Sequence, residues 1–213
     1  MEDRNTPGLY LEMTSLPSER YAEERVPAVL GLAGAMRATW WDNVVPNRSD
    51  LPRKLPEFTT LGVYEVDDAF TAPTPPDGVT GYHFRRYPRP GQGRLTGKPT
   101  IGLSLVLISP RNPANAQALR DWGDFVHIRS IAEVAVPGYS MITPYENVRD
   151  DGPKYMHFYE MDTDDPEASF QAMTPLVTKR IGASDSPEWQ AWAQHPELRI
   201  MYVNTFRRVG VSP

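Results

Sequence analysis

Short apolar runs stand at matching places in the two halves of the chain. The first half opens with GLYLEMT at residues 8–14 and the second with GLSLVLIS at residues 102–109, and both runs are typical of buried β-strands. A later β-rich run ends in acidic residues in each half, at residues 62–68 and 157–162, and each half closes on Phe-Arg-Arg. Because these pieces keep their order and approximate spacing, we interpret the chain as a tandem repeat with diverged halves.

The pattern predicts further elements in each half. In the first half we expect strands at residues 8–14, 35–43, 58–66 and 79–87, a polar loop at 47–56, and a helix from Pro17 toward Leu32 that Pro27 would kink or end. In the second half we expect strands at 102–109, 139–146, 155–162 and 199–209 and helices after Asn112, at 166–181 and after Ser186. Three prolines within residues 71–78 make a second helix implausible in the first half.

Each half therefore has approximately the β-α-β-β-(α)-β order of a ferredoxin-like unit. We predict an α+β fold of two tandem ferredoxin-like repeats that together form an intramolecular dimeric α/β barrel. Residues 1–90 would form a diverged, scaffold-like first repeat and residues 100–213 the candidate active half, with a linker at residues 91–99.

Composition narrows the class of partner. The 213 residues carry a net charge of -5, which argues against nucleic acid or an anionic membrane surface as a partner. The absence of cysteine excludes disulfides and thiolate metal sites. No run approaches the roughly 20 apolar residues of a membrane span, and the sequence does not start with a leader pattern. We therefore expect a cytoplasmic protein whose partner is a small molecule.

Three segments of the second half resemble motifs of the EthD-like branch of the dimeric α/β-barrel superfamily. They are DFVHI at residues 124–128, VPGY at 136–139 and PKYMHFYE at 153–160. The first half matches through EERVP at residues 23–27, with Arg25 where the family usually has histidine, whereas His127 is kept in the second half. Arg129 replaces a family proline, and the gap to Pro137 is about two residues longer. The resemblance implies a barrel built from two ferredoxin-like units, here within one chain that is a monomer or a homodimer.

The strand at residues 155–162 carries a candidate acid/base cluster. Alternation places Tyr155, His157 and Tyr159 on one face, and histidine is the side chain best suited to proton transfer near neutral pH. The matching first-half residues 60, 62 and 64 include Gly62, which would leave a hole in place of a base. The alternative is that His157 is a partly buried strand residue whose ring is satisfied by a tyrosine hydroxyl.

Other candidates follow from the resemblance and from side-chain chemistry. His127 stands at the family's histidine, which implies proton transfer or substrate polarisation; the alternative is a hydrogen bond at the helix end. Asp124 could orient that imidazole. Trp122 could shape a cavity or fill the core. His83 and Arg85 share a strand face and are candidate substrate contacts, with a solvated strand surface as the alternative.

The leading hypothesis is a cofactor-independent enzyme that acts on a small apolar compound, aromatic or polyketide-like. It would be a lyase, isomerase, cyclase or cofactor-free monooxygenase, with His127 and His157 as acid and base and Tyr155 and Tyr159 as hydrogen-bonding groups. No phosphate loop, nucleophile elbow or metalloprotease motif occurs, and no two histidines share a ligand-like local spacing, so neither a cofactor nor a metal is expected. The alternatives are a non-catalytic ligand-binding or scaffold barrel and a haem-binding barrel.

Overall fold

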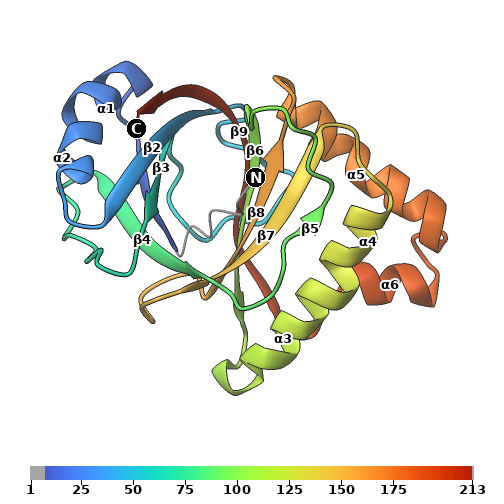
Figure 1. Cartoon of the computed structure of the whole chain (residues 1–213). Helices are drawn as coiled ribbons and strands as arrows, with labels where there is room; N and C mark the ends of the chain where they lie inside the picture. The colour runs from blue at the N-terminus through green and yellow to red at the C-terminus, as the bar shows by residue number, and fades with distance from the viewer. Residues whose placement is uncertain (1–7, 213) are drawn as a thin grey trace.

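Eight antiparallel strands close into a barrel in the computed structural model, which describes residues 8–212 (Figure 1). The first half contributes β1 (Gly8–Thr14), β2 (Ala35–Asn43), β3 (Thr60–Val66) and β4 (Val79–Arg86). The second contributes β6 (Gly102–Pro110), β7 (Tyr139–Asn147), β8 (Tyr155–Met161) and β9 (Leu198–Ser212). The spatial order is β4-β1-β3-β2-β9-β6-β8-β7, and β7 pairs back with β4 to close the barrel.

The two halves share one pairing scheme. In each half the first strand lies between the third and the fourth, and the second strand pairs with the third. The register also agrees, because Glu12 of β1 lies opposite Gly62 of β3 and Val106 of β6 lies opposite His157 of β8. Gly62 and His157 therefore occupy equivalent places in the two halves.

Side chains from both halves fill the interior of the barrel. Leu11 and Phe84 from the first half meet Leu105 and Phe206 from the second, and none of these four is exposed to solvent. The interior is therefore a packed core, as expected for a barrel of eight strands. The cavity described below lies outside the barrel wall, where helices cover the strands.

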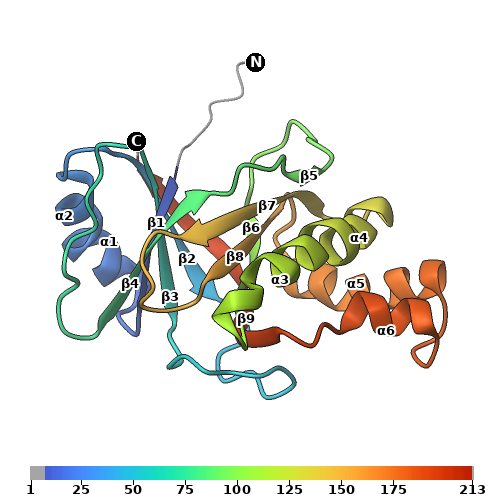
Figure 2. The same cartoon turned by 90° about the horizontal axis from the view of Figure 1, so that it is seen from below.

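The helices lie on opposite sides of the barrel (Figures 1 and 2). The first half is covered by α1 (Ser18–Glu24) and α2 (Val26–Leu30). The second is covered by a short 3-10 turn η1 (Pro113–Asn115), then α3 (Ala116–Trp122), a π-helical segment η2 (Gly123–Ile128) and α4 (Arg129–Glu133), together with α5 (Pro166–Ile181) and α6 (Pro187–Ala193). In the described part of the chain no helix is long and apolar enough to cross a membrane.

Most predicted elements are confirmed, and two features are new. The helix break at Pro27 is confirmed, since α1 ends at Glu24 and Pro27 lies in the first turn of α2. The predicted linker contains a two-residue strand, β5 (Gln92–Gly93), which pairs with β7. The predicted helix after Asn112 contains the π-helical turn of η2, which takes more residues per turn than an α-helix.

Candidate active site

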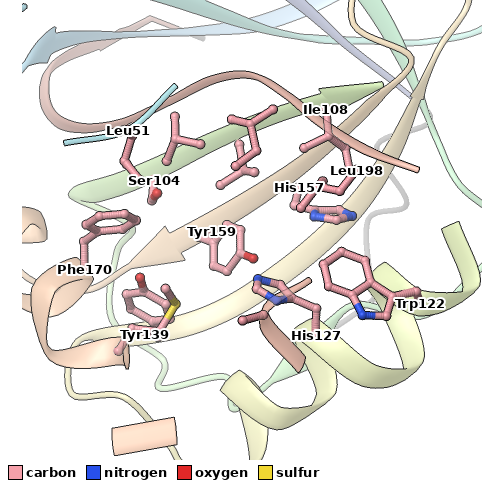
Figure 3. Close-up of a pocket in the computed structure, with 15 residues that line it drawn as sticks. Leu51, Ser104, Ile108, Trp122, His127, Tyr139, His157, Tyr159, Phe170 and Leu198 are labelled. Carbon is pink, nitrogen blue, oxygen red and sulfur yellow. The ribbon is translucent and has the colours of Figure 1, made fainter. Parts of the chain in front are cut away.

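A cavity of about 140 Å³ lies between the outer face of β6, β8 and β9 and the helices of the second half (Figure 3). An engineered cavity of about 150 Å³ accommodates benzene, so this one has room for about one ring. Its walls are mainly aliphatic and aromatic, and include Val106, Ile200 and Met173. Leu51, from the loop between β2 and β3, also lines the cavity, so both halves contribute to the cavity wall.

His127, on η2, presents one ring nitrogen to this cavity. Its Nδ1 lies 3.0 Å from the carbonyl oxygen of Trp192, and because a carbonyl can only accept, Nδ1 carries the proton. The lone pair is therefore on Nε2. The imidazole lies between the rings of Trp122 and Trp192, with both centroids 5.1 Å away. Burial lowers the pKa of His127 below its ordinary value, so the ring is a neutral base at pH 7.

His157, on β8, is buried beside a carboxylate. Its Nε2 has no hydrogen-bond partner, and Asp124 Oδ1, which also has none, lies 4.0 Å away. Burial above all, with a smaller effect from the charge of Arg120, places the pKa of His157 well below its ordinary value. Asp124 was expected to orient His127; instead its Oδ1 faces His157.

Two arginines hold Asp124 in place. Its Oδ2 accepts hydrogen bonds from Arg89 Nη1 at 2.8 Å and from Arg120 Nε at 3.1 Å, so only Oδ1 is left facing His157. Arg120 is itself buried, with its guanidinium between the rings of Tyr87 and Tyr155. Buried carboxylates normally require such charged partners. The segment before β5 thus reaches the site through Arg89.

Three hydroxyl groups complete the polar lining. Tyr159, two residues after His157 on the same face of β8, lines the cavity. Tyr139, at the start of β7, packs edge to face on Tyr159, with ring centroids 5.7 Å apart. Burial raises the pKa of both phenols, so both stay protonated. Ser104 of β6 is 1% exposed. Ser104 and Tyr139 were missed in the sequence, although Ser104 is the one polar residue in the apolar run of residues 103–108.

Buried polar atoms without partners gather at this cavity. Within residues 8–212, six buried side-chain atoms lack a hydrogen bond, and five of them lie at the cavity or directly behind it. They are Ser104 Oγ, Tyr139 Oη, His157 Nε2, Asp124 Oδ1 and Arg120 Nη2. Native structures pair nearly all buried polar groups. The concentration of unpaired atoms therefore indicates a site that binds a ligand or water.

The equivalent place in the first half is closed. The expected hole at Gly62 is absent because the Tyr21 hydroxyl fills it, and a Cβ on Gly62 would overlap that hydroxyl. Tyr21 bonds the Tyr64 hydroxyl at 2.6 Å and donates to Glu12 at 3.1 Å. Arg25 pairs with the same buried carboxylate at 2.5 Å. The first half thus has a saturated polar network where the second has a cavity.

The other predicted site residues are divided by the structure. Trp122 lines the cavity and donates its indole N–H to the Ala191 carbonyl at 2.7 Å. Tyr155 donates to the Ala116 carbonyl at 3.1 Å and packs against Ile108, outside the residues that line the cavity. His83 packs on Phe70, and Arg85 is exposed and pairs with Glu146, both on β4 away from the cavity. The structure thus brings together His127, His157, Tyr159 and Trp122.

Comparison with known proteins identifies the class of fold. No protein-family model matches the chain, and no curated protein matches it. A solved anthrone oxidase-like protein aligns over 98% of this chain and 94% of its own, at 14% identity and a TM-score of 0.54. A major regulator of staphylococcal pathogenesis aligns over 95% of this chain and 99% of its own, at 8% identity and a TM-score of 0.51. A chlorite dismutase variant from Candidatus Nitrospira defluvii aligns over 97% of this chain and 93% of its own, at 8% identity and a TM-score of 0.50.

These likenesses show that the chain shares the α+β barrel architecture of these three proteins. At such identities they define the architecture and leave activity open. Two further neighbours are named as monooxygenases, but with TM-scores of 0.48 and 0.47 they carry no argument.

A haem group, the alternative raised from the superfamily, does not fit this site. A macrocycle of four pyrrole rings is much larger than a cavity with room for about one ring. The His127 ring, which carries the free Nε2, lies between two indole rings, and His157 Nε2 faces Asp124. Across residues 8–212, no three histidine or carboxylate side chains are grouped so that they could hold a metal ion.

Proposed function

We propose that this protein is a cofactor-independent enzyme that removes a proton from a small apolar compound bound in the cavity. The observation that carries the proposal is the Nε2 lone pair of a neutral His127, which faces an apolar cavity of one-ring size. A positioned general base of this kind contributes about 10²–10⁴-fold to a rate. Its lowered pKa keeps it free of a proton at neutral pH.

The neighbouring groups have separate roles in this mechanism. Tyr159, a phenol that stays protonated, donates a hydrogen bond to the oxygen on which negative charge develops. His157, which also lines the cavity, would carry its proton on Nε2, toward Asp124. Its lone pair would then be on Nδ1. The separation of 4.0 Å is too long for a hydrogen bond, and catalytic hydrogen bonds often shorten only when ligand binds. Asp124 is thus a positioning residue for His157.

The fate of the carbanion decides the reaction type. Return of the proton to another carbon gives isomerisation, and loss of a leaving group gives a lyase. Reaction of the carbanion with O₂ gives a cofactor-free monooxygenation, in which the substrate itself supplies the electrons. The name of the anthrone oxidase-like neighbour favours this last form.

The test measures proton removal directly. Wild-type protein is incubated in D₂O with single-ring phenols and ketones, and deuterium incorporation at carbon is followed by NMR. His127→Gln should reduce the exchange rate by about 10²–10⁴-fold while the circular dichroism spectrum is unchanged. His83→Gln, at a histidine on β4 away from the cavity, is the matched control and should retain the rate. Binding without exchange in the wild type would favour the alternative of a non-catalytic ligand-binding barrel.

We also propose that the two halves are diverged copies of one ferredoxin-like unit of EthD-like type, with boundaries at residues 1–90 and 100–213. The shared strand order and the equivalence of Gly62 and His157 support this. Because the barrel closes within one chain, we expect a monomer of 24.0 kDa by native mass spectrometry. A mass of twice that value would mean that fused chains pair further.

A further inference from the structure

We infer that the ligand is an uncharged single-ring compound with a hydroxyl or carbonyl oxygen, which Ser104 and Tyr139 bind at the end of the cavity opposite His127. The inference rests on the proposed function for the identity of the site. It assigns recognition of the ligand oxygen to two residues other than the general base His127.

The two hydroxyls share one end of the cavity. Figure 3 shows Ser104 and Tyr139 near Phe170, whereas His127, His157 and Trp122 lie at the other end. The Ser104 and Tyr139 hydroxyls are buried, and neither has a hydrogen-bond partner within the described chain. A buried polar group left unpaired costs about 1–3 kcal/mol, so two such groups at one end indicate a partner that the ligand supplies.

Hydroxyls elsewhere in the second half do not show this pattern. Ser109 Oγ accepts from the backbone N–H of Lys154 at 3.0 Å, and Ser140 Oγ donates to the Glu160 carbonyl at 3.1 Å. Ser169 Oγ donates to the Pro137 carbonyl at 2.7 Å. The backbone thus satisfies these three buried serines. Ser104, in the wall of the cavity beside His157, differs from them because its hydroxyl has no partner.

Charge and size define the rest of the ligand. Aspartate, glutamate, lysine and arginine are all absent from the described residues that line the cavity. An ionised carboxylate or amine would therefore be buried without a counter-ion, which is strongly unfavourable. Charged groups near the cavity are paired with one another: Asp124 binds Arg120 behind His157, and Arg48, which lies over the Phe170 ring, binds Glu167. A hydroxyl group can donate and accept, so a phenol or a cyclic ketone satisfies the pair equally.

The experiment compares four probes by isothermal titration calorimetry with the wild-type protein. They are 4-methylphenol, toluene, 4-methylbenzoate and 2-naphthol. We expect 4-methylphenol to bind about tenfold or more tightly than toluene, since one hydrogen bond contributes about 0.5–1.5 kcal/mol and two are available. The benzoate and the two-ring naphthol should bind more weakly than 4-methylphenol. Equal affinity for 4-methylphenol and toluene, or a preference for the benzoate or the naphthol, would overturn the inference.

Variants then assign the oxygen contact. Ser104→Ala and Tyr139→Phe should each weaken 4-methylphenol binding about 3- to 10-fold and leave toluene binding unchanged. Ser130→Ala, on the helix surface, is the control and should change neither affinity. Unchanged 4-methylphenol affinity in both variants would exclude the assigned residues. If a variant does not fold, the wild-type selectivity among the four probes still tests the inference.

The outcome is separable from that of the proposed function. His127→Gln should reduce deuterium exchange by about 10²–10⁴-fold and retain the preference for 4-methylphenol over toluene. If exchange survives in that variant, the general-base proposal fails while the recognition by Ser104 and Tyr139 stands. If exchange depends on His127 but the probes show no oxygen preference, the recognition inference fails alone.

Discussion

Asp124 and His157 are two buried residues whose unpaired atoms face each other at 4.0 Å. Asp124 Oδ1 can only accept, so the arrangement favours the imidazole tautomer with hydrogen on Nε2. We expect two-dimensional ¹H–¹⁵N NMR of the wild-type protein to show His157 protonated on Nε2. Protonation on Nδ1 would contradict the role given to Asp124.

Asp124→Asn should reverse this tautomer. Arg89 and Arg120 both donate to one side of the residue, so the amide oxygen must stay there and its NH₂ group must turn toward His157. His157 Nε2 would then have to accept, and the proton would move to Nδ1. The same NMR experiment measures this, with the backbone amide spectrum as the check on folding. A purely structural Asp124 would leave the tautomer unchanged.

The two cavity histidines should also make stability depend on pH. Their folded pKa values lie below 6.5, the ordinary value that applies in the unfolded chain. As the pH falls through 6.5 the unfolded state therefore binds protons that the folded state does not, and stability decreases. The loss is up to about 1.4 kcal/mol per pH unit for each histidine, whereas above pH 6.5 their contribution is constant.

Urea unfolding at pH 7.5 and 5.5 measures this effect. His157→Gln should reduce the difference in unfolding free energy between the two pH values. An equal difference in the variant and the wild type would show that His157 is not a source of the pH dependence.

The sequence was informative about residues whose chemistry is unusual for their place. His127 could be selected because it stands at the histidine of the family that the chain resembles, and His157 and Trp122 because their side chains stand out in a strand or helix. The structure brings the three together. Ser104 and Tyr139 are ordinary strand residues, and only the position of α5 and β8 beside them makes their hydroxyls unusual. Tyr155 shares the strand face of His157, yet α3 covers it, which alternation along one strand cannot predict.

At the scale of elements, β3 and β8 occupy equivalent positions but have different surroundings. Gly62 leaves space that Tyr21 of α1 occupies, whereas His157 lies against Gly123 of η2, which lets the helix approach. Gly62→Ala should therefore destabilise the protein by about 1–3 kcal/mol, because its Cβ would overlap the Tyr21 hydroxyl. Urea unfolding measures the change. The deuterium exchange rate of the folded variant should equal that of the wild type, since the altered pocket lies in the other half. A stability within about 0.5 kcal/mol of the wild type would contradict the packing described for β3.

Local signals predicted elements well where they were strong. The bounds of β2 and of α5 agree with the predicted residues 35–43 and 166–181, because alternating and capped patterns are set by nearby residues. The two-residue strand β5 has no such pattern and depends on its pairing with Met141 and Ile142. The π-helical turn of η2 likewise has no local pattern that predicts it.

At the scale of the whole molecule, the barrel makes the two halves one folding unit. They are hydrogen-bonded along two seams, β2 with β9 and β4 with β7, and their side chains share one core. Neither half can expose its side of that core to water without losing the burial that stabilises the other. We therefore expect a single cooperative unfolding transition, although the sequence reads as two repeats.

Leu11→Ala tests this coupling from the half that lacks the cavity. Leu11 is fully buried in the shared core, so the substitution should cost about 2–5 kcal/mol. Hydrogen exchange in urea, resolved by mass spectrometry of peptides from β3 and β8, should show the same lowered midpoint in both halves. Leu95→Ala, at a residue that is 80% exposed, should leave both midpoints in place. If β3 exchanges at lower urea while β8 keeps its wild-type midpoint, the halves fold separately, and the cavity then depends on the second half alone.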